Sequence, residues 1–207
     1  MAQLGDGHPH KNDPALLNAI RAVGELLAAE GETVGIVVVG GAAMILGGLV
    51  TRLTEGVDII AAARSWRKGV PTTIAPPNPL PAALLRAVSR VARDFNLPEN
   101  WMNSEVGAQW DTGLPPGFEK RVRWLRFGGL ALGVADRKDL IFLKLYAAVD
   151  SQGPQSVHYQ DLLALRPNKR ELAAAATWVK SQDTSAEFDQ VLEKVLDYVN
   201  RDQEEPH

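Results

Sequence analysis

The stretch TVGIVVVGG, residues 33–41, constrains the fold more than any other part of the chain. It is apolar on both alternating faces, which indicates a strand buried on both sides inside an α/β sheet. The strand runs into Gly40 and Gly41 and then into AAMILGGL, which we expect to form a short helix. A strand that ends in Gly-Gly before a helix presents backbone N–H groups, and such groups can bind a phosphate.

The rest of the chain predicts an α/β region followed by helices. A second strand is expected at GVDIIAAA, residues 56–63, and a hairpin at 119–135 with Gly128 and Gly129 as its turn. The proline-rich residues 65–81 and the stretch 96–117 are predicted to be irregular connections. Helices are predicted at 14–30, 81–95, 137–149 after Asp136, 157–165, and after two capping pairs, Asn168 with Glu171 and Thr184 with Glu187.

Length and composition set the domain count and the compartment. A chain of 207 residues with 45% hydrophobic content can build one sizeable core with a helical extension. We expect an α/β core at 1–135 and a helical C-terminal region at 136–207 that packs on it. The chain has no cysteine, which excludes disulfides, thiolate catalysis and cysteine-based zinc sites. No apolar run is long enough to span a membrane and no leader is recognisable, so a cytoplasmic protein is expected.

Three kinds of phosphate site, and one structural explanation, compete for the glycine pair. A P-loop would need Gly-Lys-Ser/Thr, which is absent. A dinucleotide-binding turn would need G-x-G-x-x-G and an acid at the far end of the next strand, whereas Asp58 lies at the beginning of its strand. A nucleotidyltransferase would use Gly-Gly with carboxylates on the adjacent strand. Alternatively, the glycines only permit tight packing.

Asp58 is the candidate metal ligand on the second strand. Carboxylates at positions i and i+2 of a strand share a face and can hold a pair of Mg²⁺ ions. The partner position of Asp58 is Gly56, which has no side chain, and Glu55 is aimed at the opposite face unless a bulge turns it. Three other acids lack a supporting motif: Glu105, Asp111 and Asp150. The missing carboxylate predicts weakened metal binding.

The segment VVVGGAAMILGGLVTRLTEGVDII resembles the first motif of the AbiEii-like and MenT-like nucleotidyltransferases, and in particular their subgroup catalogued as a domain of unknown function. The matching residues are Gly40, Gly41, Ala43, Arg52, Thr54 and Asp58. DLIFLKLYAAVD resembles the lysine motif of that family, with Lys144, and HYQDLLAL resembles its following acidic motif, with Asp161. Asn103 in WMN resembles a recurrent position to which we assign no role.

This resemblance implies a nucleotidyltransferase fold, a small mixed sheet flanked by helices, and Mg²⁺ or Mn²⁺ as cofactor. It implies transfer of a nucleoside monophosphate from an NTP, with Asp58, Lys144 and Asp161 as catalytic residues. Gly40, Gly41, Arg52 and Thr54 would bind the nucleotide. In several members the acceptor is a tRNA 3′ end and the protein is the toxin of a toxin–antitoxin pair. The alternative is a weakened relative that binds nucleotide or RNA, or acts only as an interaction protein.

Lys144 and Asp161 each have a simpler explanation. A helical lysine flanked by leucines can pack its stem and keep its ammonium in water, and Asp161 can be a solvated helix residue. The functional alternative makes Lys144 a cation for the triphosphate and Asp161 a metal ligand or a base.

Basic residues gather at 64–68, 119–126 and 166–170, and Trp66 and Trp124 interleave with the first two groups. Such a pattern suits base stacking and phosphate binding, although solvated charges with both tryptophans in the core are the simpler expectation.

Overall fold

The computed structural model describes residues 14–51, 54, 56–151 and 153–204. These residues form two compact units, each described below by itself. The first unit holds the chain up to Asp111 together with Gly117–Asp136, and the second holds 112–116 and the chain from Arg137.

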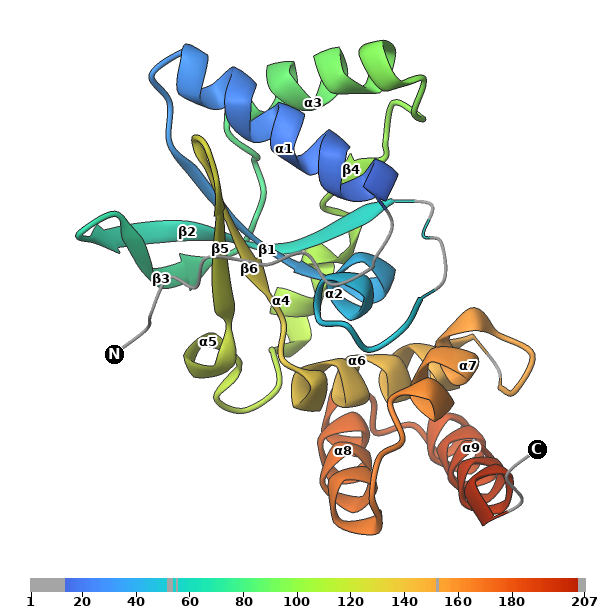
Figure 1. The fold of residues 1–207 in the computed structure, drawn as a ribbon. Helices are drawn as coiled ribbons and strands as arrows, with labels where there is room; N and C mark the ends of the chain where they lie inside the picture. Colours follow the sequence, from blue (N-terminus) through green and yellow to red (C-terminus); the bar gives the residue numbers. More distant parts are fainter. Residues whose placement is uncertain (1–13, 52–53, 55, 152, 205–207) are drawn as a thin grey trace. The chain divides into compact units, whose positions relative to one another are not determined.

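The first unit is built on a mixed sheet (Figure 1). The order along the sheet is β3-β2-β1-β6-β5, and a short β4 pairs with β2 beside this path. The central strand β1 is parallel to β6 and antiparallel to β2. All six residues of β1 are buried, which confirms the strand predicted from its apolar run. The bounds are β1 Val34–Val39, β2 Val57–Arg67, β3 Val70–Ala75, β4 Met102–Asn103, β5 Arg123–Phe127 and β6 Leu130–Val134.

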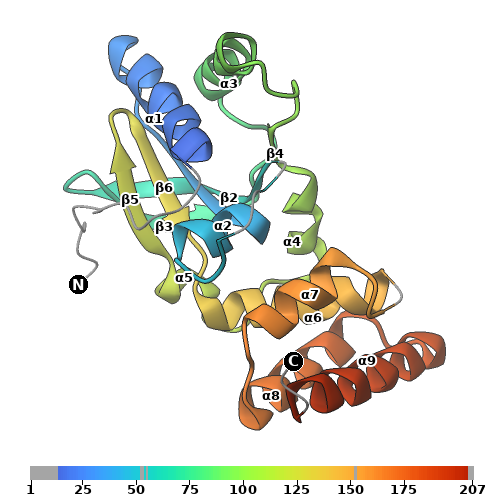
Figure 2. The same cartoon turned by 45° about the vertical axis from the view of Figure 1, so that its right-hand side comes forward.

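Helices flank this sheet, as predicted. The long helices α1 (Pro14–Ala29) and α3 (Ala82–Phe95) lie side by side, and α1 also packs on β5 and β6 (Figures 1 and 2). The short α2 (Gly40–Leu46) follows β1 directly and packs against β1 and β2. The remaining short elements are η1 (Glu105–Ala108), α4 (Gln109–Thr112) and α5 (Phe118–Arg121).

The irregular connection predicted for residues 65–81 is wrong in its first half. β2 continues to Arg67, and β3 returns antiparallel to it from Val70 to Ala75. Lys68 and Gly69 form the turn, and both have positive φ, 51° and 75°, as a two-residue hairpin requires. Proline is tolerated here because Pro71 lies on an edge strand. Only the prolines after Ala75 belong to a loop.

The connection at 96–117 contains more order than expected. β4 lies within it and pairs in parallel with the beginning of β2, so that Met102 lies opposite Val57 and Asn103 opposite Asp58. A two-residue strand is too short to produce a recognisable periodic pattern. It nevertheless places a backbone segment directly beside the candidate metal ligand.

The second unit contains a C-terminal helical region, as the predicted fold class requires. Its helices are α6 (Arg137–Asp150), α7 (Val157–Ala164), α8 (Lys169–Gln182) and α9 (Ala186–Glu204), and α6 packs against the other three. The capping pair of Asn168 and Glu171 is confirmed as a reciprocal capping box. The pair of Thr184 and Glu187 is wrong, because the Ser185 hydroxyl accepts from the backbone N–H of Phe188 at 3.3 Å.

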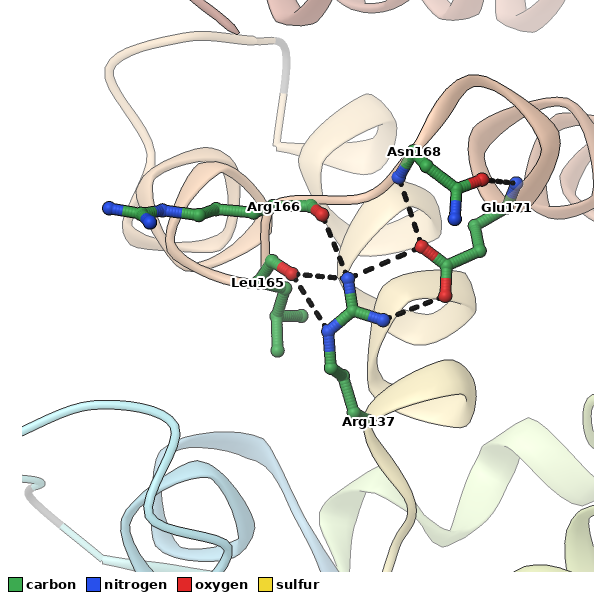
Figure 3. Close-up of polar contacts among 5 residues, drawn as sticks. All are labelled: Arg137, Leu165, Arg166, Asn168 and Glu171. Carbon is green, nitrogen blue, oxygen red and sulfur yellow. Dashed lines mark hydrogen bonds and ion pairs between the residues drawn. The ribbon is translucent and has the colours of Figure 1, made fainter. Parts of the chain in front are cut away.

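Arg137, the first residue of α6, joins three segments of this unit (Figure 3). Its guanidinium donates to the carbonyls of Leu165 and Arg166 and forms an ion pair with Glu171 at 2.7 Å. The network therefore connects the beginning of α6 to the segment between α7 and α8 and to the first turn of α8. None of the described helices is both long and apolar enough to span a membrane.

Candidate active site

Gly40 and Asp58 lie in contact at the junction of β1 and α2. The register of β1 and β2 places Val39 opposite Asp58, one residue before the helix begins. Gly40 has φ +64°, and a Cβ atom built on it would collide with the Asp58 carboxylate. Only glycine satisfies both conditions without strain. The half-buried Asp58 carboxylate therefore lies against the Gly-Gly turn, so that the candidate metal ligand and the candidate phosphate-binding turn adjoin.

Backbone occupies the position where a side chain of residue 56 would begin. The N–H of Val57 donates to the carbonyl of Trp101 at 2.6 Å, as part of the pairing between β2 and β4. A Cβ atom on Gly56 would lie 2.7 Å from that same carbonyl oxygen. Gly56 lies against Trp101, and Asp58 lies against Gly40. The structure therefore has no space ready for a carboxylate side chain at position 56.

The turn before β2 is partly described. The Thr54 hydroxyl donates to the carbonyl of Gly56 at 3.2 Å, which fits a residue that orients this turn. Arg52, assigned to nucleotide binding, and Glu55, considered as a substitute ligand, lie outside the described residues. Asn103 is engaged in its own loop, since its side chain donates to the Asn100 carbonyl and accepts from the Glu105 N–H.

Lys144 and Asp161 form a buried ion pair between α6 and α7. The Lys144 Nζ lies 2.7 Å from Asp161 Oδ2, and the two side chains are 8% and 3% exposed. The Nδ1 atom of His158 lies 3.3 Å from the same Nζ. The ammonium is therefore not held in water, and Asp161 is not a solvated helix residue. Both simpler explanations from the sequence are wrong.

Tyr159 fixes α7 beside this ion pair. Its hydroxyl donates to Asp202 Oδ2 of α9 at 2.8 Å. Burial, followed by the hydrogen bond to Asp202, raises the pKa of Tyr159 above its usual range. The phenol thus stays protonated at neutral pH and keeps α7 attached to α9, which supports the position of Asp161.

The candidate residues fall into two groups, one in each compact unit. Gly40, Gly41, Thr54 and Asp58 belong to the first unit, and Lys144 with Asp161 belongs to the second. Two groups at these positions, the His158 side chain and the Trp101 carbonyl, were not predicted from the sequence. His158 lies three residues before Asp161, a spacing that places both on one helix face and was open to detection. The Trp101 carbonyl carries no sequence signal.

A metal would find one carboxylate in the first group. Among the described residues, no three His, Cys, Asp or Glu side chains come together as a metal site. Glu105, Asp111 and Asp150, considered as substitute ligands, are all exposed. Mg²⁺ is commonly held by one or two carboxylates together with the phosphates of a substrate. The donor set around Asp58 thus fits one Mg²⁺ that binds with a triphosphate.

Comparisons with known proteins identify the family. The sequence model of the family described as "Nucleotidyltransferase of unknown function (DUF6036)" matches residues 15–165, a range that runs from α1 to the end of α7 and contains every candidate site residue. Searches among curated proteins and among solved structures find no significant match. The match covers well over half of the chain, which therefore belongs to this family of nucleotidyltransferases.

Proposed function

We propose that the protein transfers a nucleoside monophosphate from an NTP to a hydroxyl of an RNA acceptor. The acceptor oxygen forms a bond to the α-phosphorus, and the bond between that phosphorus and the oxygen bridging the α- and β-phosphates breaks. Pyrophosphate leaves, and the hydroxyl proton passes to a base. The family implies the NTP. The observation that carries the proposal is the contact between the Asp58 carboxylate and Gly40.

The first group of residues would bind the triphosphate. Backbone N–H groups at Gly40 and Gly41 suit phosphate oxygens, and Arg52 and Thr54 are proposed to support them. Asp58 would hold Mg²⁺ or Mn²⁺, which neutralises charge on the triphosphate when it is bound.

The second group would supply a fixed cation. The Lys144 ammonium is oriented by Asp161 and His158, so it loses little freedom when it meets a triphosphate. Asp161 is thereby a positioning residue in this proposal, and it is also the candidate base for the acceptor hydroxyl. A carboxylate that is ion-paired with a lysine is a weaker base and accepts a proton readily only when that pair loosens, so the positioning role is the better supported one.

The acceptor and the biological role follow from the finer resemblance to AbiEii-like and MenT-like proteins. On that ground we propose a tRNA 3′ end as the acceptor, and a toxin that is neutralised by a cognate antitoxin. Incubation with each of the four α-labelled triphosphates, Mg²⁺ and total tRNA should yield labelled RNA with at least one nucleotide. No label from any of the four would contradict transfer to tRNA.

A second candidate is a weakened relative that binds nucleotide or RNA without turnover. It is favoured by Gly56 and by the Trp101 carbonyl, which together exclude a second carboxylate at this position. Calorimetry separates the two candidates. Binding of an NTP with Mg²⁺ but without product supports the weakened relative, whereas binding with product supports the enzyme.

A further inference from the structure

Two basic segments that are distant in sequence meet at one groove of the first unit. The cavity measures about 580 Å³ and lies between the β2–β3 hairpin and the α5–β5 segment. Arg67 and Lys68 line it from the hairpin, and Lys120 lines it from α5. These residues come from the segments 64–68 and 119–126, so the fold brings together what the sequence shows as separate patches.

Three cations and one acid, Glu119, line the groove, in a chain whose formal net charge is -3. The segment 64–68 carries three cations and no acid, and 119–126 carries four cations and one acid. That acid, Glu119, accepts a hydrogen bond from the backbone N–H of Ile74 at 3.0 Å, so its carboxylate is directed to β3. Arg67, Lys68 and Lys120 are exposed. The charge complements a polyanion.

Trp124 lines the groove, and Trp66, the residue before Arg67, lies on the same face of the sheet without lining it. A Cβ atom on Gly35 would lie 3.0 Å from the Trp66 ring, and one on Gly133 would lie 3.0 Å from both the Trp124 ring and the Val37 side chain. Residues 35 and 37 of β1 point to one face because they are two apart in a strand. Trp124 is buried, as expected, but the expectation of a buried Trp66 is wrong, because its side chain is 37% exposed.

We propose that this groove binds a single-stranded segment of RNA. Arg67, Lys68 and Lys120 contact its phosphates, and the exposed Trp66 ring stacks on a base. Bases of a single strand are free to stack on an aromatic side chain, and cations along a groove follow its backbone. The inference rests on the proposed function in taking RNA as the acceptor, and it assigns the acceptor a binding surface away from the Asp58 centre.

The test measures binding of a short fluorescein-labelled single-stranded RNA by anisotropy, without triphosphate. We compare the wild type with Arg67→Gln/Lys120→Gln, which removes one cation from each side of the groove. The matched control is Arg21→Gln/Lys194→Gln, which removes the same charge from exposed positions of α1 and α9, outside the three basic segments. Circular dichroism checks that each variant folds.

The groove variant should bind about 25-fold more weakly at 0.1 M salt, with a salt slope lower by about 1.4, since each phosphate contact to a single strand contributes about 0.7. The control should bind like the wild type. Trp66→Leu keeps apolar cover over Gly35 and should weaken binding about fivefold or more through lost stacking. Equal losses in groove and control variants would overturn the proposal.

Two further outcomes are decisive. If poly-glutamate competes as well as RNA of matched charge, the groove suits an acidic protein segment and the RNA assignment is wrong. Asp58→Asn should abolish transfer and leave RNA binding unchanged. RNA binding without any transfer in the wild type would therefore contradict the proposed function and leave the groove assignment standing.

Discussion

At the scale of single residues, the site depends on how closely two atoms approach across the end of β1. Asp58 provides a carboxylate, and this carboxylate can lie against the turn because Gly40 has no side chain. The sequence motif indicates both residues but not their contact, because the contact depends on the register of β1 and β2.

Gly40→Ala tests this contact, and Gly31→Ala is its matched control. Both glycines have positive φ, +64° and +72°, but a Cβ on Gly31 would meet no atom within 4 Å. Gly31→Ala should cost about 1–2 kcal/mol of unfolding free energy from backbone strain alone. Gly40→Ala should cost about 1–3 kcal/mol more because it displaces the carboxylate. Urea unfolding measures both, and equal costs would contradict the contact.

Gly56→Asp should not restore a two-carboxylate site. The added Cβ meets the Trp101 carbonyl, so β4 must shift, at a cost of about 1–3 kcal/mol. Gly56→Ala introduces the same Cβ and should lose a similar amount of stability. The measurement is urea unfolding together with transfer rate. A Gly56→Asp protein that is as stable as the wild type and faster in transfer would refute the steric argument.

At the scale of elements, periodicity predicts long helices and the buried strand, and capping residues predict α8. Prediction from periodicity fails where tertiary contacts determine the structure. β3 contains a proline and lies at an edge, and β4 is two residues long, so neither shows a periodic pattern. The Lys144–Asp161 ion pair could not be predicted for a similar reason. The sequence places each residue on a helix, but it does not show that the two helices pack against each other.

The Lys144–Asp161 pair should be costly to break from one side. Lys144→Met takes the lysine partner away from the buried Asp161 carboxylate and should cost about 3–5 kcal/mol of unfolding free energy. Lys144→Met/Asp161→Leu removes both charges and should cost much less. Urea unfolding of the wild type, the single variants and the double variant gives the coupling energy. Transfer that survives in a folded double variant would remove both residues from the proposed chemistry.

The Arg137–Glu171 network should make stability depend on pH. The hydrogen bond from Arg137 holds the pKa of the Glu171 carboxyl below its ordinary value of 4.5. The unfolded chain is therefore protonated first as pH falls, and the stabilisation is full above about 4.5 and lost as pH drops through the folded pKa. Glu171→Gln should cost about 1–3 kcal/mol at pH 7.

Urea unfolding of the wild type and Glu171→Gln across pH measures this effect. The difference between them should shrink below pH 4.5. A difference that stays constant from pH 7 to acid would show that the carboxylate charge contributes nothing.

At the scale of the whole molecule, the candidate residues are divided between a mixed α/β unit and a helical unit. The sequence predicts both kinds of structure, because β-branched runs dominate the first part and helical periodicity the last. Joining Asp58 and Lys144 in one reaction is a proposal that rests on the family match, which spans residues from both units. Activity of the whole chain is the property that can establish it.

The most direct measurement of the central claim is the rate of nucleotidyl transfer as a function of Mg²⁺ concentration, for the wild type and for Asp58→Asn. The wild type should label RNA from an α-labelled triphosphate, lose activity with a chelator, and regain it with Mg²⁺. Asp58→Asn should fold and lose at least about 100-fold in rate, the scale of loss seen when one group that stabilises transition-state charge is removed. An Asp58→Asn protein as active as the wild type would contradict the account.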